Sequence, residues 1–362
     1  MKLLFFQNCV SPHQMPYIEV LAKRHDVTVV VPFVSYEARE QMGWSRIDES
    51  TSVRLVVAPK MEEVRTLFEQ EYEGRTVALF SGISAFREVK SWFLMSLNYR
   101  VERGIITEAP YTFDKPLWMH KLRFMIQDLR YVRHIDYVFA IGRNCEAYYR
   151  TWSRRWRVIP FAYCVSSLTP HPTSLTPHPT SFITVGSLDD RKNVIMQLKA
   201  LVELRQTHKN EYDRCSLTIV GDGPLRKDLE QFVVENALSD KVAFTGALPM
   251  NEARERIAQS QVLMLTSKHD GWGAVVNEAL VAGTRVICTG TCGASALIDN
   301  EKKRGCVVDC GDVHSLAEAL CDEIMQMQDP EQKTMQREEI RQWAQENIGP
   351  EAIAGYFEKS LC

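Results

Sequence analysis

The sequence predicts an α/β protein with two doubly wound parallel sheets, one in each of two domains. The chain has 362 residues, which is too long for one core of ordinary size and fits two domains. Short apolar runs alternate with longer helical segments along the chain, as in parallel sheets covered by helices. A proline-rich segment separates two such series, so we expect a linker between the domains and a cleft where they face each other.

The first domain is predicted over residues 1–165. Its strands are short, continuous apolar runs, which are typical of strands buried on both faces. They are expected at residues 2–7, 27–32, 53–58, 76–80, 104–107, 136–141 and 157–162. A helix is expected between the first two strands, because Pro16 favours a helix start and Ile18 and Leu21 recur with helical spacing.

Two ionisable residues of the first domain fall in loops beyond the carboxyl ends of its strands, where a doubly wound sheet binds ligands. His13 lies in the loop after the first strand, and Glu108 directly follows the strand at 104–107. A contact with substrate is one interpretation of each residue. The alternatives are a solvated loop histidine for His13, and a helix cap or a surface ion pair for Glu108.

The segment 114–133 is predicted to be helical and mixes apolar with basic residues. Its apolar side chains are expected to pack mainly on the sheet. Between Lys115 and Arg157, ten Lys and Arg stand against three Asp and Glu, a local net charge of +7. Because each Lys or Arg near an anionic bilayer contributes about 1 kcal/mol to binding, this region is interpreted either as a peripheral membrane contact or as a solvated basic face.

The middle of the chain repeats the heptapeptide SLTPHPT in tandem, at residues 167–173 and 174–180. Its prolines and its lack of bulky side chains predict an extended connector, so residues 166–181 are assigned as the linker. The second domain follows over residues 182–330. Residues 331–362 are expected to form one or two C-terminal helices, broken at Gly349-Pro350, that could pack back on the first domain.

The second domain repeats the alternation of strands and helices. Its strands are expected at residues 181–186, 217–221, 242–246, 262–267, 285–290 and 306–309. Its helices are expected near residues 191–206, 224–237, 250–259, 274–282, 294–299 and 312–328. This order predicts a second doubly wound sheet.

The segment 269–282, HDGWGAVVNEALVA, has the composition of a ligand-binding turn that leads into a helix. Gly271 and Gly273 allow the backbone to approach a ligand closely, and the N–H groups at the start of the helix attract anions. Asp270 lies in the turn and Glu278 on the inner face of the helix, and we expect both carboxylates to point toward one small space. Phosphate groups and sugar hydroxyls are the ligands that this combination favours.

The composition argues against several classes of function. A net charge of −3 gives no bulk affinity for nucleic acid. The N-terminal apolar run is too short for a signal peptide, and no run approaches the roughly 18 apolar residues of a membrane span, so a cytosolic protein is expected. The cysteines lack the commoner zinc spacings, so Cys288, Cys292, Cys306 and Cys310 are interpreted as ordinary thiols.

Three motifs of the second domain carry a resemblance to a known family. They are VGSLDDRKNV at 185–194, VGDGP at 220–224, and the segment 269–282 followed by GTRVICTGTCG at 283–293. In order and spacing they resemble the motifs of the retaining glycosyltransferases of family four, which have the two-domain GT-B architecture. The third motif is the most specific, because it holds two acidic residues separated by seven others. The first domain resembles the family less closely, and His13, His120 and His134 are its candidates for the family's cleft histidine.

The resemblance implies a role for each motif. Arg191 and Lys192 would hold the diphosphate of a nucleotide sugar, and Ser187 stands where many relatives carry Arg. Asp270 would contact the transferred sugar, where the family usually has Glu, and Glu278 would bind the ribose hydroxyls. The other implied donor-site positions are Gly186, Gly221, Gly223 and the backbone of Gly271, Trp272, Gly273, Ala274 and Val275.

The implied reaction is transfer of a glycosyl unit from a nucleoside-diphosphate sugar to an acceptor hydroxyl, with retention at the anomeric carbon. Lys192 and Arg191 would stabilise the charge that grows on the leaving diphosphate, while Glu108 and His13 are candidates on the acceptor side. No cofactor and no metal is expected, because the chain has no Asp-x-Asp triplet. The family and the basic first domain favour a lipid-linked or polysaccharide acceptor in bacterial envelope synthesis, at the inner face of the cytoplasmic membrane.

Other classes of protein could share the fold and some of the motifs. A sugar-nucleotide epimerase, a phosphorylase-like enzyme or a non-catalytic sugar-nucleotide-binding subunit could use the same fold. A nicotinamide-dependent oxidoreductase is disfavoured, because VGDGPLR lacks the third glycine of the dinucleotide fingerprint.

Overall fold

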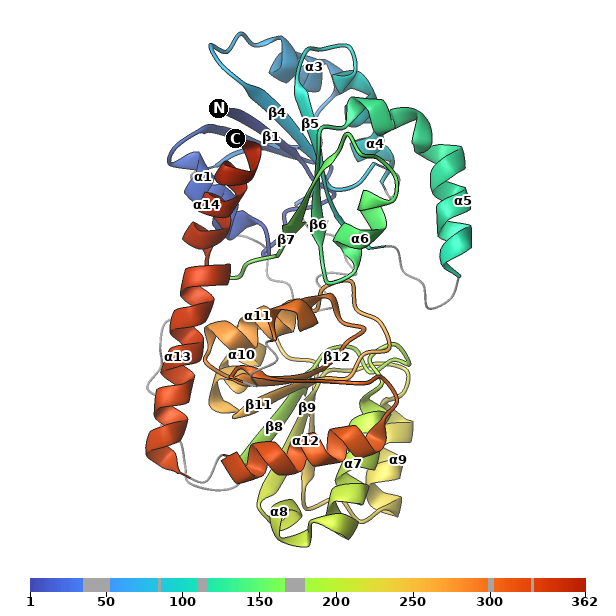
Figure 1. Ribbon diagram of the computed structural model, residues 1–362, viewed down its shortest axis with the longest axis vertical. Coiled ribbons are helices and arrows are strands. Elements are labelled where there is room, and N and C mark those ends of the chain that lie inside the picture. Colours follow the sequence, from blue (N-terminus) through green and yellow to red (C-terminus); the bar gives the residue numbers. More distant parts are fainter. Residues whose placement is uncertain (35–52, 84–85, 110–115, 167–179, 299–302, 327–328) are drawn as a thin grey trace. The chain divides into compact units, whose positions relative to one another are not determined.

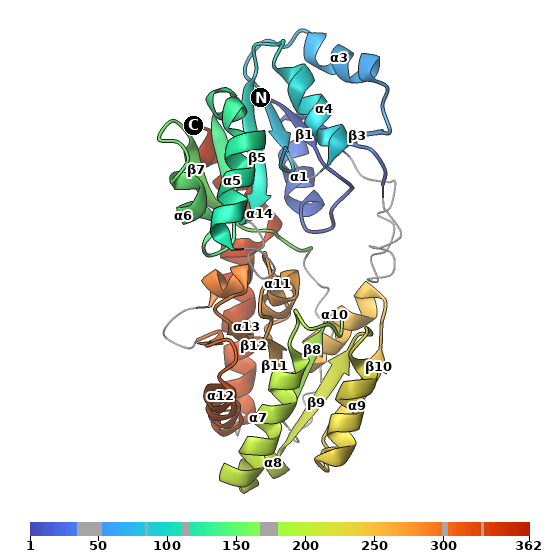
Figure 2. The same ribbon diagram turned by 90° about the vertical axis from the view of Figure 1, so that its right-hand side faces the viewer.

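The computed structural model contains two parallel sheets, each in its own compact unit (Figures 1 and 2). It describes residues 1–34, 53–83, 86–109, 116–166, 180–298, 303–326 and 329–362. The first unit holds the described residues up to Ser166 together with Pro350–Cys362, and the second holds the described residues from Thr180 to Gly349. Residues 167–179 of the predicted linker repeats lie outside the described residues.

The sheet of the first unit has seven parallel strands in the order β3-β2-β1-β4-β5-β6-β7. The strand order reverses between β1 and β4. The strands are β1 (Lys2–Phe6), β2 (Asp26–Val31), β3 (Arg54–Val57), β4 (Thr76–Phe80), β5 (Glu102–Glu108), β6 (Tyr137–Ile141) and β7 (Arg157–Phe161). Every strand predicted for this half is present, within a few residues at each end.

Helices flank this sheet and complete its core. They are α1 (Met15–Ala22), α3 (Met61–Glu69), α4 (Arg87–Ser96), α5 (Leu117–Gln127), the 3-10 helix η1 (Leu129–His134) and α6 (Cys145–Arg150). The C-terminal helix α14 (Pro350–Leu361) lies beside α1 in Figure 1 and contacts it. Its Phe357 packs against Phe5, Tyr17 and Phe139 of this unit, so α14 contributes to the core of the first unit.

The sheet of the second unit has six parallel strands in the order β10-β9-β8-β11-β12-β13. They are β8 (Thr180–Val185), β9 (Cys215–Val220), β10 (Val242–Gly246), β11 (Val262–Leu265), β12 (Arg285–Thr289) and β13 (Gly305–Val308). All six predicted strands are confirmed. β8 begins at Thr180, inside the stretch assigned to the linker.

The helices of the second unit occur where the sequence predicts them. They are α7 (Val194–Thr207), α8 (Lys209–Asp213), α9 (Arg226–Glu235), α10 (Met250–Gln259), α11 (Ala274–Val281), the 3-10 helix η2 (Gly293–Leu297), α12 (Val313–Gln326) and α13 (Pro330–Ile348). The short helix α8 is an addition to the predicted set. Buried aliphatic side chains of α7, α9 and α12 form the core against the sheet. The break between α13 and α14 falls at Gly349, as predicted.

The predicted packing of the segment 114–133 is wrong. In helix α5, Phe124 packs on the unit, with its ring 4.3 Å from that of Trp152. Trp118 is 64% exposed and Ile126 is 71% exposed. Leu122 and Met125 on the same helix are exposed as well, and so is Leu129 at the start of η1. The helical periodicity was sufficient to predict an apolar stripe, but the stripe is exposed to solvent. Helix α5 lies at the edge of the unit in Figure 1.

Candidate functional site

The strand order of the second unit reverses between β8 and β11. From β8 the sheet continues to β9 and β10 on one side and to β11, β12 and β13 on the other. The loops that follow β8 and β11 therefore leave the sheet toward opposite faces, and open α/β sheets bind ligands where this happens. These two loops, residues 186–193 and 266–273, carry most of the predicted donor-site residues. The topology brings the two loops together.

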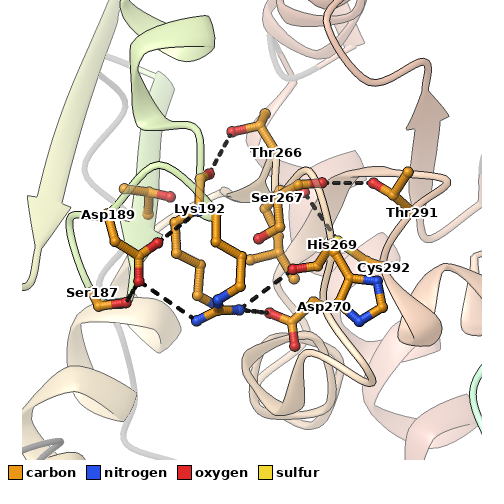
Figure 3. Close-up of polar contacts among 12 residues, drawn as sticks. Ser187, Asp189, Lys192, Thr266, Ser267, His269, Asp270, Thr291 and Cys292 are labelled. Carbon is orange, nitrogen blue, oxygen red and sulfur yellow. Dashed lines mark hydrogen bonds and ion pairs between the residues drawn. The ribbon is translucent and has the colours of Figure 1, made fainter. Parts of the chain in front are cut away.

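Lys192 and Asp270 meet between these two loops (Figure 3). The Nζ atom of Lys192 lies 2.7 Å from Oδ2 of Asp270, and the side chains are 14% and 15% exposed. Arg191 approaches the same oxygen at 3.5 Å and an oxygen of Asp189 at 3.8 Å. The two cations, Lys192 and Arg191, therefore pair with two carboxylates, so the cluster has almost no net charge. Its side chains are mostly buried.

Backbone hydrogen bonds hold this cluster in place. The Lys268 amide donates to the Arg191 carbonyl at 2.8 Å, which joins the two loops. The Asp270 carbonyl accepts a bond from the Gly293 amide at 2.9 Å, and the two segments form a parallel bridge. The Lys192 amide donates to Oδ1 of Asp189 at 2.9 Å. The charged side chains thus extend from a backbone that is fixed on both sides.

The strand-end glycines allow two loops to lie against each other. A Cβ on Gly221 would lie 1.9 Å from the Gly186 carbonyl oxygen, and a Cβ on Gly223 would lie 2.6 Å from the Leu188 carbonyl oxygen. Gly186 itself sits beside the side chain of Lys192, whose Cε would be 3.2 Å from an added Cβ. Gly221 and Gly223 are therefore required for the close contact between the two loops, and Gly186 lies against the side chain of Lys192. Direct binding of a ligand by them remains a prediction.

The turn before α11 also depends on a glycine. Gly273 has φ +93°, and an added Cβ would lie 2.7 Å from Cδ2 of Leu265. Helix α11 starts at Ala274, one residue later, as the sequence predicts. Trp272 is buried, donates from Nε1 to Oδ1 of Asn277 at 2.6 Å, and accepts at its carbonyl from Ala294. Its indole thus anchors the turn from inside, which the sequence did not indicate.

Glu278 lies on α11 and has a partner that the sequence analysis missed. Its Oε1 accepts a hydrogen bond from Nε of Arg254 at 3.0 Å, and both side chains are buried. Burial raises the pKa of the Glu278 carboxyl, and the charge of Arg254 and its hydrogen bond oppose that shift. Arg254 comes from the neighbouring helix α10. In the sequence it is one basic residue of a charged helix, and only the packing of α10 on α11 identifies it.

Cys292 lies close to the charged cluster but is not activated by it. Burial raises the pKa of this thiol to about 11, which Asp270 favours and Lys192 opposes. At neutral pH the residue is therefore a protonated thiol, which is a weak nucleophile. It packs below the Asp270 turn and contributes no charge to the site.

The predicted residues of the first unit lie around its own sheet. Glu108 is the last residue of β5, half-buried, and so ends the strand instead of following it. His13 lies in the loop after β1, where its carbonyl accepts from the Cys164 amide and its ring lies 6.2 Å from that of Tyr163. His120 lies on α5 and His134 ends η1. The roles of these residues stay predictions.

Part of this chain is similar to a known protein family. Residues 172–343 match the family described as glycosyl transferases group 1. The 2-deoxystreptamine glucosyltransferase of Streptomyces kanamyceticus is 34% identical over 109 residues, 30% of this chain and 27% of that protein. A Campylobacter jejuni α-1,4-N-acetyl-D-galactosaminyltransferase that acts on an undecaprenol-linked saccharide is 29% identical over 197 residues, 53% of this chain and 52% of that protein.

Solved structures resemble the whole chain. The Anabaena protein HepE, solved with UDP, has a TM-score of 0.70 at 16% identity and covers 100% of this chain and 99% of that one. With the two parallel sheets, this likeness confirms the two-domain GT-B fold. The chain spans about half or less of the length of the curated relatives it matches. In the described part of the chain, no helix is long and apolar enough to cross a membrane.

Proposed function

We propose that this chain is a retaining glycosyltransferase, which moves a sugar from a nucleoside-diphosphate sugar to a hydroxyl of a carbohydrate acceptor. The observation that carries the proposal is the pair of Lys192 and Asp270 at the point where the strand order of the second unit reverses. A cation and a carboxylate held together there offer one group for a phosphate and one for a sugar hydroxyl. The match of residues 172–343 to the glycosyl transferases group 1 supports this assignment.

In this proposal Lys192 and Arg191 bind the diphosphate of the donor. Negative charge grows on the diphosphate as the bond between sugar and phosphate breaks, so fixed cations stabilise the transition state more than the ground state. Asp189 and Asp270 already balance the two cations. Donor binding would give each cation a second anion, and Asp270 would then be free to turn one oxygen toward the sugar. The two cations make a metal unnecessary, so turnover should not depend on added magnesium.

The turn and helix after Asp270 complete the proposed donor site. The first N–H groups of α11 have no partner within the helix, and those of Gly271–Val275 are proposed to contact the sugar and the diphosphate. Glu278 is proposed to accept hydrogen bonds from the ribose hydroxyls. Its bond to Arg254 fixes the carboxylate in one orientation, which lowers the entropy that ribose binding would cost.

The first unit is proposed to bind the acceptor, with Glu108 and His13 as candidates for contact with its hydroxyl. A lipid-linked acceptor is favoured by helix α5, whose exposed apolar stripe is flanked by Lys121, Arg123 and Arg130. An exposed apolar stripe with basic neighbours is the pattern of a helix that lies in the surface of an anionic bilayer. We therefore place the reaction in the cytoplasm, at the inner face of the cytoplasmic membrane.

The decisive test of the function is release of free nucleoside diphosphate. Pure protein would be mixed with a panel of labelled nucleotide sugars, with and without extracts that contain lipid-linked or soluble saccharides. Uridine donors come first, because HepE is solved with UDP-glucose. Release that requires an extract, together with label in a product of the same anomeric configuration, supports the proposal.

Other outcomes identify the alternatives. Conversion of one nucleotide sugar into another without release indicates an epimerase. Tight binding in calorimetry without turnover in any extract indicates a binding subunit. A product of inverted configuration would support a glycosyltransferase but refute the retaining mechanism.

A further inference from the structure

Metal-ligating side chains gather at a second place in the second unit, where α7 and α8 meet α12. Among the residues that the structure describes, His208, Glu211 and Cys321 form a group whose ligand atoms all lie within 4.8 Å of one another. His208 is the residue between α7 and α8, Glu211 lies on α8, and Cys321 lies on α12. The three helices contact one another at this point (Figures 1 and 2).

The types of ligand point to one class of ion. Imidazole nitrogen, thiolate sulfur and carboxylate oxygen are the ligands of zinc, whereas calcium and magnesium prefer oxygen alone. From zinc bond lengths of about 2.0–2.3 Å, atoms bound to one tetrahedral ion lie roughly 3.4–3.6 Å apart. Side-chain movements of about 1 Å would therefore bring the three ligand atoms to these distances. No rearrangement of the helices is needed.

A fourth residue strengthens the group. Glu318 lies on α12, three positions before Cys321, and its Oε1 is 3.0 Å from Nε2 of His208. If Nε2 binds the ion, Glu318 is close enough to become the fourth ligand. If Nδ1 binds it, Glu318 accepts the Nε2–H bond and orients the ring, as carboxylates do behind many metal-bound histidines. Two carboxylates and one thiolate carry three negative charges, which a divalent cation reduces to one.

We propose that His208, Glu211 and Cys321 bind a zinc-class divalent ion, with Glu318 as fourth ligand or as the partner of the imidazole. The ion would fasten the end of α7 and helix α8 to α12. Cys321 is buried and His208 is partly exposed, so the ion would enter from the solvent side and the thiolate would close the site from within.

This site lies apart from the proposed reaction. Helix α7 begins at Val194, two residues after Lys192, and ends at Thr207, next to His208. Its 14 residues span about 21 Å at 1.5 Å per residue. The ion would therefore change the stability of the second unit without entering the sugar-transfer step. Because α7 follows the donor loop, the ion would also fix the end of α7 that is farther from this loop.

Binding would release a proton from the thiol. A free cysteine is mostly a thiol at neutral pH, and its sulfur binds an ion only as a thiolate. One proton should leave the thiol for each zinc bound, and it should be detectable in weak buffer with a pH indicator.

The experiment uses the full chain, stripped with a chelator and titrated with Zn²⁺ or Co²⁺ alone. We expect one ion per chain, a near-ultraviolet thiolate-to-cobalt absorption, and a higher thermal midpoint with zinc. At a free zinc concentration of 100 times Kd, the unfolding equilibrium should shift about a hundredfold. Cys321→Ser should abolish the cobalt absorption, and Glu318→Gln should weaken zinc binding about 10- to 100-fold.

Two variants serve as matched controls. His314→Ala removes a different histidine, on α12, that also pairs with a glutamate, Glu203, but does not belong to the group of His208, Glu211 and Cys321. Cys310→Ser removes an exposed thiol elsewhere in the unit. Both should bind cobalt like the unchanged chain. The proposal is overturned if the unchanged chain shows no thiolate absorption, or if Cys310→Ser loses it while Cys321→Ser keeps it. If Cys321→Ser does not fold, His208→Ala decides, because it must lower zinc affinity at least tenfold.

Discussion

The Nζ atom of Lys192 lies 2.7 Å from Oδ2 of Asp270, although 78 positions separate the two residues in the chain. The contact exists because β8 and β11 are neighbours at the reversal of strand order, so the loops that follow them meet. Each side chain is thereby held in one place before any ligand arrives. A positioned cation stabilises developing charge at a lower cost of reorganisation than a mobile one.

Lys192→Ala should lower turnover by about a hundred- to a thousandfold, because it removes a fixed cation from the leaving diphosphate. The fold should be retained, as far-ultraviolet circular dichroism would check. Lys268→Ala is the matched control, since Lys268 comes from the same pair of loops but is paired with Asp190 on the exposed side. Equal losses in both variants would mean that general charge, and not the position of Lys192, matters.

Asp270→Asn should separate binding of the diphosphate from turnover. The change leaves Lys192 and Arg191 with one carboxylate fewer, so the affinity for free nucleoside diphosphate should rise by about 1 kcal/mol, roughly fivefold in Kd. Turnover should fall, because the sugar loses its carboxylate. Calorimetry and steady-state kinetics measure the two effects. Asp190→Asn, which removes the partner of Lys268, should change neither, and weaker diphosphate binding by Asp270→Asn would contradict the assignment.

Glu278→Gln should weaken nucleotide binding only when the ribose hydroxyls are present. Hydrogen bonds to a charged group contribute about 1.5–3 kcal/mol, so Kd for the ribonucleoside diphosphate should rise roughly 10- to 150-fold. The 2′,3′-dideoxy analogue should bind both proteins alike. Glutamine keeps an acceptor for Arg254, which limits damage to the fold. The same loss with both nucleotides would show that Glu278 acts through structure alone.

The strands and the donor loops could be predicted because their signals are local. A continuous apolar run such as Tyr137–Ile141 is sufficient to indicate a buried strand, and the glycine turn before Ala274 predicts the start of α11. The pairing of Arg254 with Glu278 could not be predicted, since it depends on how α10 packs on α11. The exposed stripe of α5 was missed for a related reason: periodicity indicates an apolar face but not which element, if any, covers it.

Gly221→Ala should destabilise the second unit by about 2 kcal/mol or more. The added methyl group would overlap the Gly186 carbonyl oxygen, and the backbone has φ +145°, where side chains are strained. Chemical denaturation followed by circular dichroism measures the change. Gly355→Ala is the control, because that glycine lies in α14 with nothing within 4 Å of an added Cβ. There alanine should stabilise by about 0.5–1 kcal/mol, and similar effects at both sites would refute the close contact of the loops.

Replacing both Trp118 and Ile126 by Ser should weaken binding to membranes at least tenfold, because α5 is proposed to lie in the bilayer surface. Full burial of one large apolar side chain contributes about 1.5–3 kcal/mol. If both residues are only half buried in the bilayer, their replacement should lower the affinity for vesicles at least tenfold. Flotation with anionic vesicles at low and high salt measures it.

Two further variants separate the apolar from the charged part of the interaction. The double variant Lys121→Gln and Arg123→Gln should weaken binding to anionic vesicles about tenfold or more, because each charge contributes about 1 kcal/mol, and should leave binding to neutral vesicles unchanged. Val234→Ser removes an equally exposed apolar residue from α9 of the second unit and should have no effect. If the unchanged chain stays with the soluble fraction at low salt, or if Val234→Ser matches the α5 variant, the stripe on α5 does not bind membranes and needs another partner.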